Sequence, residues 1–373
     1  MDELKMLRDR IDDTDKEILG LFLKRMELCK GVADYKKANN LPVFQGGREQ
    51  QVIDRIKKLT NDERLENGTA ALFTTIMDIS KILQNRLIQA DLPDTVYSAP
   101  DFENASRIGC QGTSGANSEA AARMIFGDKD FTFYPSFEDV FRAVQSGELE
   151  YGILPVNNST AGSIDSTYDL LAKYSVYIVK EVTLEINHCL AAKENIPLSE
   201  IECVYSHPQA LSQCEGFLTE NSLKTHSYGN TATAAERVKN SERKIAAVCS
   251  EDCAKQLGLT ILATGIADCS VNRTQFICIS REMQVLPDSD AISVMLEIPH
   301  TEGSLYRLLT KFYINGMNLL RIENRPIKNG SFEVMFFLNF SGRITDPHVQ
   351  AVMKDLQENV EVFRCLGTFR NDD

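Results

Sequence analysis

The sequence has no excess of basic residues and no long apolar run, and each absence excludes a class of protein. Its 373 residues include 40 Lys and Arg against 53 Asp and Glu, a formal net charge of −13, whereas a general nucleic-acid binder needs a basic face. No apolar stretch approaches the ~18 residues that cross a bilayer. Residues 1–10 are charged and lack the apolar core of a secretory signal. We therefore expect a cytoplasmic protein that contacts neither nucleic acid nor membrane.

The ten cysteines lack the spacing of a metal or redox motif. There is no C-x-x-C pair, and the closest two cysteines, Cys249 and Cys253, are separated by three residues. No histidine stands near them at zinc-finger spacing. Reduced, buried thiols are therefore expected, with no metal and no cofactor.

The pattern of apolar residues changes along the chain and predicts three modules. Residues 1–90 have a helical period, residues 91–104 have none and contain two prolines, and residues 105–283 alternate short apolar strands with helices. Residues 290–373 give the order βαββαβ, with Asn329-Gly330 as a hairpin turn. The expected fold is thus an all-α module, a linker, an α/β module and an α+β ferredoxin-like module.

Three helices are predicted in the first module, over residues 3–38, about 47–59 and about 69–89. Each has a long apolar stripe. Helices in ~90 residues cannot bury three such stripes against one another. We therefore expect them to pair with a second copy of the chain.

Polar side chains interrupt these apolar faces. Arg25 occupies a position on the apolar face of the first helix, and the others lie on or beside the faces of the three helices: Arg8, Lys36, Arg48, Glu49, Ser80 and Gln84. Singly, each is explained by an ion pair or a helix–helix hydrogen bond. Together they predict a polar pocket inside a helical bundle. Several cations with one carboxylate and one amide suit a small dicarboxylate, and a reaction that needs only restraint and electrostatics.

This constellation resembles the all-helical chorismate mutases over nearly all of residues 1–90. The resemblance implies rearrangement of chorismate to prephenate in a dimer. It implies that Arg8 reaches into the partner's site and that Glu49 meets the substrate hydroxyl. Substrate carboxylates and the ether oxygen would be held by Arg25, Lys36, Arg48, Ser80 and Gln84. Gln45 stands where these mutases usually have Asp, and an amide can still hydrogen-bond a hydroxyl.

In the α/β module, polar loops follow several predicted strands. Strands are expected at residues 107–109, 151–156, 177–181, 203–205, 244–248 and 275–279. Ligands in α/β folds bind at the carboxyl ends of strands. The polar loops lie near residues 109–118, 155–163, 206–211, 230–235 and 272–276. Each alone is explained by capping or turn chemistry, including a structural His207.

Jointly, the five loops resemble the prephenate dehydratases across residues 105–283. The resemblance implies a two-lobed fold like that of periplasmic binding proteins, with the site in the cleft. The implied reaction expels water and carbon dioxide from prephenate to give phenylpyruvate. Thr274 would donate to the departing oxygen. The cleft would be lined by Thr113, Ser118, Asn158, Ser159, Thr160, Ser206, Gln209 and Thr231.

Two positions depart from the dehydratase pattern. Asn157 stands where the family usually has Glu, and Gln275 where it usually has Arg. We hypothesise that the two residues are neighbours and that a salt bridge was lost from both together. Asn117 also replaces a usual aromatic residue. If the missing Arg binds substrate, the dehydratase lobe is weakened or inactive, and the protein has a binding or regulatory role.

The last module has two short motifs, Gly303-Ser304-Leu305 and Glu323-Asn324-Arg325-Pro326. They resemble in part the two effector-binding motifs of ACT domains fused to such dehydratases. The resemblance implies feedback inhibition by phenylalanine bound between paired modules. Taken alone, the motifs are explained equally well by a glycine at a helix start and a proline at a strand end.

The leading interpretation is a bifunctional enzyme of phenylalanine biosynthesis that forms a homodimer or higher oligomer. Two alternatives keep the same fold: a regulatory protein with an inactive dehydratase lobe, and an enzyme that acts on arogenate, the aminated analogue of prephenate. A ligand-binding protein of the periplasmic type fits less well, because the sequence lacks a signal peptide and has the helical module.

Overall fold

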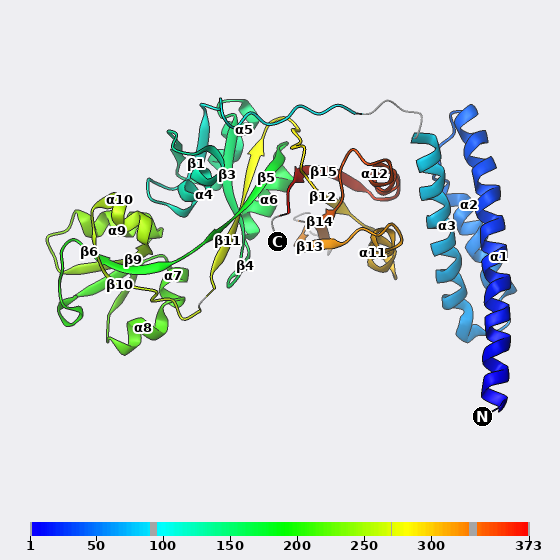
Figure 1. Ribbon diagram of the computed structural model, residues 1–373, viewed down its shortest axis with the longest axis horizontal. Helices are drawn as coiled ribbons and strands as arrows, with labels where there is room; N and C mark the ends of the chain where they lie inside the picture. Colours follow the sequence, from blue (N-terminus) through cyan, green and yellow to red (C-terminus); the bar gives the residue numbers. More distant parts are fainter. Residues whose placement is uncertain (1, 90–94, 270, 328–333, 372–373) are drawn as a thin grey trace. The chain divides into compact units, whose positions relative to one another are not determined.

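The structure is a computed structural model that describes residues 2–89, 95–269, 271–327 and 334–371 (Figure 1). Its contacts divide the chain into two compact units. The first combines Met1–Val96 with Val294–Arg364, and the second combines Tyr97–Ser293 with Cys365–Asp373. In the part of the chain that the structure describes, no helix is both long and apolar enough to span a membrane.

The first unit begins with three helices, as the sequence predicts. They are α1 (Asp2–Ala38), α2 (Gly46–Leu59) and α3 (Glu66–Gln89), with a 3-10 turn at Glu63–Leu65 before α3. Helix α3 packs against both α1 and α2. Much of the apolar stripe of α1 nevertheless stays exposed in a single chain, at Leu4, Leu7, Ile11, Ile18, Leu21, Leu28 and Val32. A second copy of the chain could cover these exposed residues, as the sequence analysis expects, and the dimer stays a prediction.

The C-terminal segment has the predicted element order. Its elements are β12 (Ala291–Glu297), α11 (Ser304–Ile314), β13 (Leu319–Pro326), β14 (Val334–Ser341), α12 (Pro347–Asn359) and β15 (Val362–Phe369). The strand order is β13-β14-β12-β15. Helices α11 and α12 both contact α3 of the helical segment. The predicted hairpin turn at Asn329-Gly330 lies outside the described residues, as does most of the predicted linker before residue 95.

The second unit contains two sheets, which we call its first and second lobes. The first-lobe strands are β1 (Ile108–Gln111), β2 (Thr132–Tyr134), β3 (Tyr151–Asn158), β4 (Gly162–Ser163), β5 (Tyr177–Glu185) and β11 (Arg273–Ser280). They run in the order β5-β11-β3-β1-β2, and β4 pairs with β3. The first-lobe helices are α4 (Asn117–Phe126), α5 (Phe137–Ser146) and α6 (Asp165–Lys173). The sequence predicted the long strands and missed the short β2 and β4.

The second lobe is built on strands β6 (His188–Ala192), β7 (Cys203–Ser206), β8 (Thr225–Ser227), β9 (Ile245–Ser250) and β10 (Thr260–Thr264), in the order β10-β6-β9-β7-β8. Its helices are α7 (Pro208–Ser212), α8 (Glu215–Glu220), α9 (Thr231–Lys239) and α10 (Glu251–Leu257), with a 3-10 turn at Leu198–Glu200. Strand β6 sends Cys189 and Ala191 into one apolar cluster and Leu190 and Ala192 into the other. Because both faces are buried, β6 has no polar alternation, and the sequence analysis missed it.

The chain crosses between the two lobes twice, after β5 and before β11 (Figure 1). At the crossing, the Ile186 amide donates to the Asn272 carbonyl at 2.8 Å. The end of β3 and the start of β11 lie beside each other here, with Asn158 opposite Thr274. The dehydratase residues predicted from two separate loops therefore meet at the junction of the lobes.

Candidate functional sites

A cavity of about 420 Å³ opens among the three N-terminal helices. Its wall includes all but one of the residues predicted for the mutase site: Arg25, Lys36, Gln45, Arg48, Glu49, Ser80 and Gln84. The exception is Arg8, which is exposed on the first turns of α1. A single chain cannot place a residue that is expected to enter the site of a second copy, so the role of Arg8 stays a prediction.

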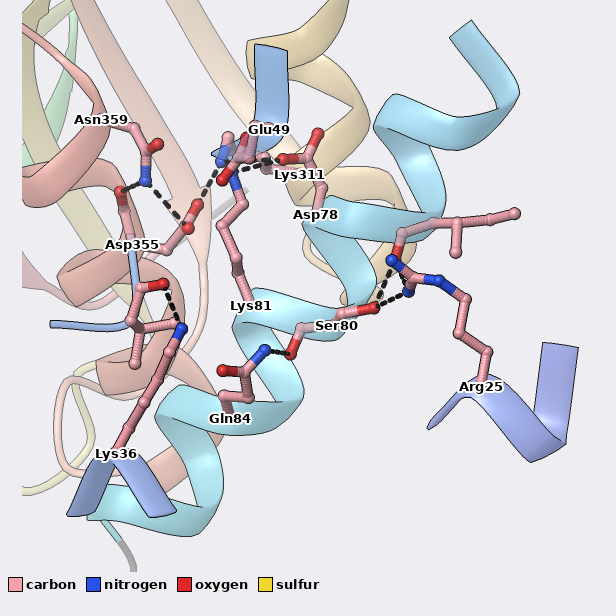
Figure 2. A network of polar contacts seen from close by, with 12 residues as sticks. Arg25, Lys36, Glu49, Asp78, Ser80, Lys81, Gln84, Lys311, Asp355 and Asn359 are labelled. Carbon is pink, nitrogen blue, oxygen red and sulfur yellow. Dashed lines mark hydrogen bonds and ion pairs between the residues drawn. The ribbon is translucent and has the colours of Figure 1, made fainter. Parts of the chain in front are cut away.

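Arg25 is held against α3 by local hydrogen bonds. Its guanidinium donates to the Ser80 hydroxyl and, at 3.5 Å, to the Ile76 carbonyl (Figure 2). The Ser80 hydroxyl in turn donates to the same Ile76 carbonyl at 2.7 Å. Since the Ser80 proton is used within α3, the hydroxyl anchors Arg25 while the rest of the guanidinium fork stays available to a carboxylate.

Lys36 and Gln84 are both buried in the wall of this cavity. The Lys36 ammonium donates to the Val43 carbonyl at 2.7 Å. Burial lowers the pKa of Lys36 from its ordinary value, although the nearby Glu49 carboxylate opposes the shift. The Gln84 amide donates to the Ser80 carbonyl at 3.2 Å. An amide nitrogen has two N–H groups, so one remains for an oxygen of a bound molecule.

A second cavity, of about 520 Å³, lies between the two lobes of the other unit. Its described wall contains Ser118, Asn158, Gln209, Thr231 and Thr274, all predicted from the sequence, and no Lys, Arg, Asp or Glu. The first turns of α4 and α9 face it instead, and no side chain caps α4. The free N–H groups at the start of α4 and the positive dipole ends of both helices are suited to anions.

The α4 end is held in place by Glu119. Its buried carboxylate accepts from the Gly115 amide at 2.6 Å and forms an ion pair with Arg123 at 2.7 Å. Gly112 and Gly115 have φ values of 113° and 82°. Residues that have a side chain rarely adopt such positive φ values, so the loop needs glycine at both positions.

Four side chains form a closed ring of hydrogen bonds at the crossing between the lobes. Asn158 donates to Asn272 at 2.8 Å, and Asn272 donates to Gln213 at 3.0 Å. Gln213 donates to the Thr160 hydroxyl at 2.6 Å, which donates to the Asn158 carbonyl oxygen at 2.7 Å. Every donor points the same way around the ring, so the bonds strengthen one another.

The ring sets the direction of the Thr274 hydroxyl. Asn158 donates its amide N–H to Thr274 Oγ1 at 2.9 Å. An amide nitrogen cannot accept, so the Thr274 proton points away from Asn158. Thr274 lines the cavity. Its hydroxyl is thus placed to donate to a bound molecule.

Four residues predicted to line the dehydratase cleft are not in the described wall of the cavity: Thr113, Ser159, Thr160 and Ser206. Ser206 is fully buried and donates to the Val248 carbonyl. The Ser159 hydroxyl accepts from the Arg273 amide, and Thr160 belongs to the ring. These hydrogen bonds give Ser159, Thr160 and Ser206 partners within the protein, and the contact of all four residues with the substrate stays a prediction. His207 caps α7 through Nδ1, as its structural interpretation predicted.

His188 and Gln213 were not predicted from the sequence. His188 Nε2 bonds Gln213 Oε1 at 2.9 Å, and burial lowers the pKa of His188, although this hydrogen bond opposes the shift. Both residues line the cavity. Two sequence features could have pointed to them. His188 is a histidine inside an apolar run, and Gln213 is a glutamine at the end of the short helical segment after Ser206-His207. Neither gives the register that brings them together.

The predicted effector residues lie on two elements of the C-terminal segment. Gly303 has a φ of 76° and precedes α11, with Ser304 buried and Leu305 exposed. Glu323, Asn324, Arg325 and Pro326 lie on β13, at one end of the strand order β13-β14-β12-β15. Along β13 the exposed residues Asn324 and Pro326 alternate with the half-buried residues Glu323 and Arg325.

A polar cavity in a helical module and a second, charge-free cavity between two α/β lobes define a two-site enzyme. Comparison with known proteins agrees. Residues 7–85 match the family description "Chorismate mutase type II", and residues 108–284 match "Prephenate dehydratase". The chain is 30% identical to a bifunctional chorismate mutase/prephenate dehydratase of Aquifex aeolicus over 99% of this chain and 98% of that one.

Two further similarities cover a smaller share of the chain. An arogenate dehydratase/prephenate dehydratase of Arabidopsis thaliana is 34% identical over 75% of this chain and 76% of its own. The crystal structure of an Arthrobacter aurescens prephenate dehydratase in complex with L-Phe superposes with a TM-score of 0.66 at 26% identity. It covers 71% of this chain and 90% of that chain. The chain belongs to the bifunctional chorismate mutase/prephenate dehydratase family. It is an enzyme that rearranges chorismate to prephenate and converts prephenate to phenylpyruvate.

Proposed function

We propose that the helical cavity is the mutase site. Arg25, Arg48 and Lys36 hold the substrate carboxylates and the ether oxygen, and Gln84 donates its free N–H to that oxygen. Glu49 and Gln45 meet the hydroxyl, and Arg8 of a second copy completes the site. The convergence of these side chains on one cavity supports the proposal. The reaction needs no nucleophile, because the cations stabilise charge that grows on the breaking ether bond.

We infer that the cavity between the lobes is the dehydratase site and that the Thr274 hydroxyl donates a hydrogen bond to the departing oxygen. The carboxylates of prephenate bind at the first turns of α4 and α9, near Ser118 and Thr231. The ring carboxylate leaves as carbon dioxide, its bond electrons complete the aromatic ring, and the C–O bond breaks. The departing hydroxide is stabilised by the Thr274 hydroxyl. The observation that carries the assignment is the hydrogen bond from Asn158, which leaves the Thr274 proton to the substrate.

Replacement of Thr274 tests this role. Thr274→Val keeps the shape and removes the donor, and we expect the dehydratase kcat to fall by about 100-fold, as when one donor to a developing oxyanion is removed. Thr274→Ser should keep most of the activity. The mutase activity of the same chain serves as the control for folding. A fully active Thr274→Val enzyme would refute the role.

We propose prephenate, rather than arogenate, as the preferred dehydratase substrate. Arogenate has an ammonium group where prephenate has a ketone. A bound ammonium needs a carboxylate partner, and the described wall has no Asp or Glu. The ratio of kcat/KM for the two substrates measures the preference. A ratio in favour of arogenate would support the alternative drawn from the plant relative.

We further propose that the C-terminal segment is an ACT sensor that binds phenylalanine, between Gly303-Ser304-Leu305 of one copy and Glu323-Asn324-Arg325-Pro326 of another. The βαββαβ order and the end position of β13 support it. So does the L-Phe complex of the similar dehydratase. We place the enzyme in the cytoplasm, since all ten cysteines are unpaired.

A further inference from the structure

Lys81 is a buried cation next to the mutase cavity that the sequence analysis did not single out. Only 6% of its surface is exposed. Its ammonium lies 3.1 Å from Glu49 Oε2 and 3.0 Å from Asp78 Oδ1 (Figure 2). The ammonium also lies over the Phe44 ring, 5.4 Å from its centroid. Both Lys81 and Glu49 line the cavity. Lys81 therefore contacts the carboxylate that is assigned to the substrate hydroxyl.

Asp78, the other partner of Lys81, also forms an ion pair with a residue of the C-terminal segment. Asp78 is 4% exposed and also pairs with Lys311 of α11 at 3.6 Å. Lys311 pairs in turn with Asp355 of α12, which bonds Asn359 at 3.0 Å. Figure 2 shows this chain of alternating charges running from Glu49 to Asp355. All of it lies within the first compact unit.

Four groups of this chain of charges are buried: Asp78, Lys81, Lys311 and Asp355. Their burial costs free energy, so a chain of ion pairs is by itself weak evidence for stability. Burial by itself lowers the pKa of Lys81, but the attraction of Asp78, Asp355 and Glu49 outweighs it and raises the pKa above the ordinary value. Lys81 thus stays charged across the physiological range. Its charge is held by Asp78 whether or not Glu49 turns toward a substrate.

We propose that Lys81 is a positioning residue for the mutase reaction, which fixes the Glu49 carboxylate at the cavity wall while Lys311 and Asp355 hold Asp78 behind it. The proposal rests on the mutase site proposed above. If Lys81 has this role, the geometry of the mutase site depends on Lys311 and Asp355 of the C-terminal segment. A loosened Glu49 would meet the substrate hydroxyl in fewer productive orientations.

A double-mutant cycle in the full-length chain separates positioning from simple structural support. Lys81→Met should lower the mutase kcat/KM by about 10- to 100-fold, as expected when a working group is misplaced. Lys81→Arg should recover part of it. In a Glu49→Gln background, the same Lys81→Met change should have almost no further effect, because the carboxylate to be positioned is gone. An equal loss in both backgrounds, or no loss in either, overturns the proposal.

The dehydratase activity of each variant is the control for folding, since no residue of this chain of charges lines the dehydratase cavity. A Lys81→Met enzyme that loses both activities together shows a structural role and contradicts the proposal. The contribution of the C-terminal segment is tested by Lys311→Met, which should lower mutase kcat/KM several-fold. Lys354→Met is the matched control, because Lys354 is exposed on α12 and pairs with Glu358 at 3.5 Å. Equal mutase activity in these two variants would refute the link.

Arg25→Ala and Glu49→Gln distinguish this inference from the site assignment. If both variants keep full mutase activity, the helical cavity is not the site, and the role of Lys81 fails with it. If both lose activity while Lys81→Met does not, the site stands and only the role of Lys81 is wrong.

Discussion

Asn157 donates its side-chain amide to Gln275 Oε1 at 3.2 Å, and the two residues are direct partners across β3 and β11. The hypothesis that they are neighbours is confirmed. In the family pattern these positions have Glu and Arg, so a neutral hydrogen-bonded pair stands where an ion pair is expected. The two departures from the family pattern therefore lie in direct contact with each other.

This pair predicts an asymmetry between single and double substitutions. Asn157→Glu alone places a carboxylate in a half-buried position beside an amide, and we expect the unfolding free energy of the lobe to drop by about 1–3 kcal/mol. Adding Gln275→Arg should recover most of the loss. The midpoint of thermal inactivation of the dehydratase measures both. Losses that simply add would show that the two positions do not interact.

The helices of the mutase module and the long strands of the dehydratase unit were predictable because their periodicity reflects one buried face. The same logic located Arg25, Lys36 and Glu49, polar residues at positions where apolar ones are expected. Strand β6 was not predictable in this way, because both of its faces are buried and its apolar run has no alternation. Its first residue, His188, was missed with it.

The sequence also could not predict the hydrogen-bonded ring of Asn158, Asn272, Gln213 and Thr160. Its members are up to 114 residues apart in the sequence. They meet only because of the register of β3 against β11 and the crossing of the chain between the lobes. Lys81 was missed for another reason. It follows Ser80 directly, in a helix turn already explained by Ser80 and Gln84, and only the fold shows that Glu49 and Asp78 both reach it.

The lowered pKa of Lys36 predicts how the mutase depends on pH. The protonated ammonium attracts the substrate, so activity is present below the pKa of Lys36 and lost above it. Because burial lowers that pKa, kcat/KM should begin to fall at a pH below the ordinary lysine value. Lys36→Arg should shift this alkaline limb upward, since guanidinium stays charged. An unchanged profile in Lys36→Arg would assign the limb to another group.

The exposed stripe of α1 predicts an obligate dimer with shared mutase sites. Light scattering at micromolar concentration should give at least twice the monomer mass, and Ile11→Glu should lower it. Arg8→Ala and Arg25→Ala should each abolish mutase activity alone. After the two variants are mixed and allowed to exchange subunits, about a quarter of wild-type activity should return, because each mixed dimer has one intact site. No recovery after proven exchange would place Arg8 and Arg25 in the same chain's site.

The central claim is that the cations lining the cavity among the N-terminal helices bind a substrate with two carboxylates. Measuring both activities of Arg25→Ala in the full-length chain tests it most directly. We expect mutase kcat/KM to fall by at least about 100-fold, the effect of losing a charge-assisted, transition-state contact of about 3 kcal/mol, while dehydratase kcat/KM stays at the wild-type value. Normal mutase activity in a folded Arg25→Ala enzyme would contradict the account.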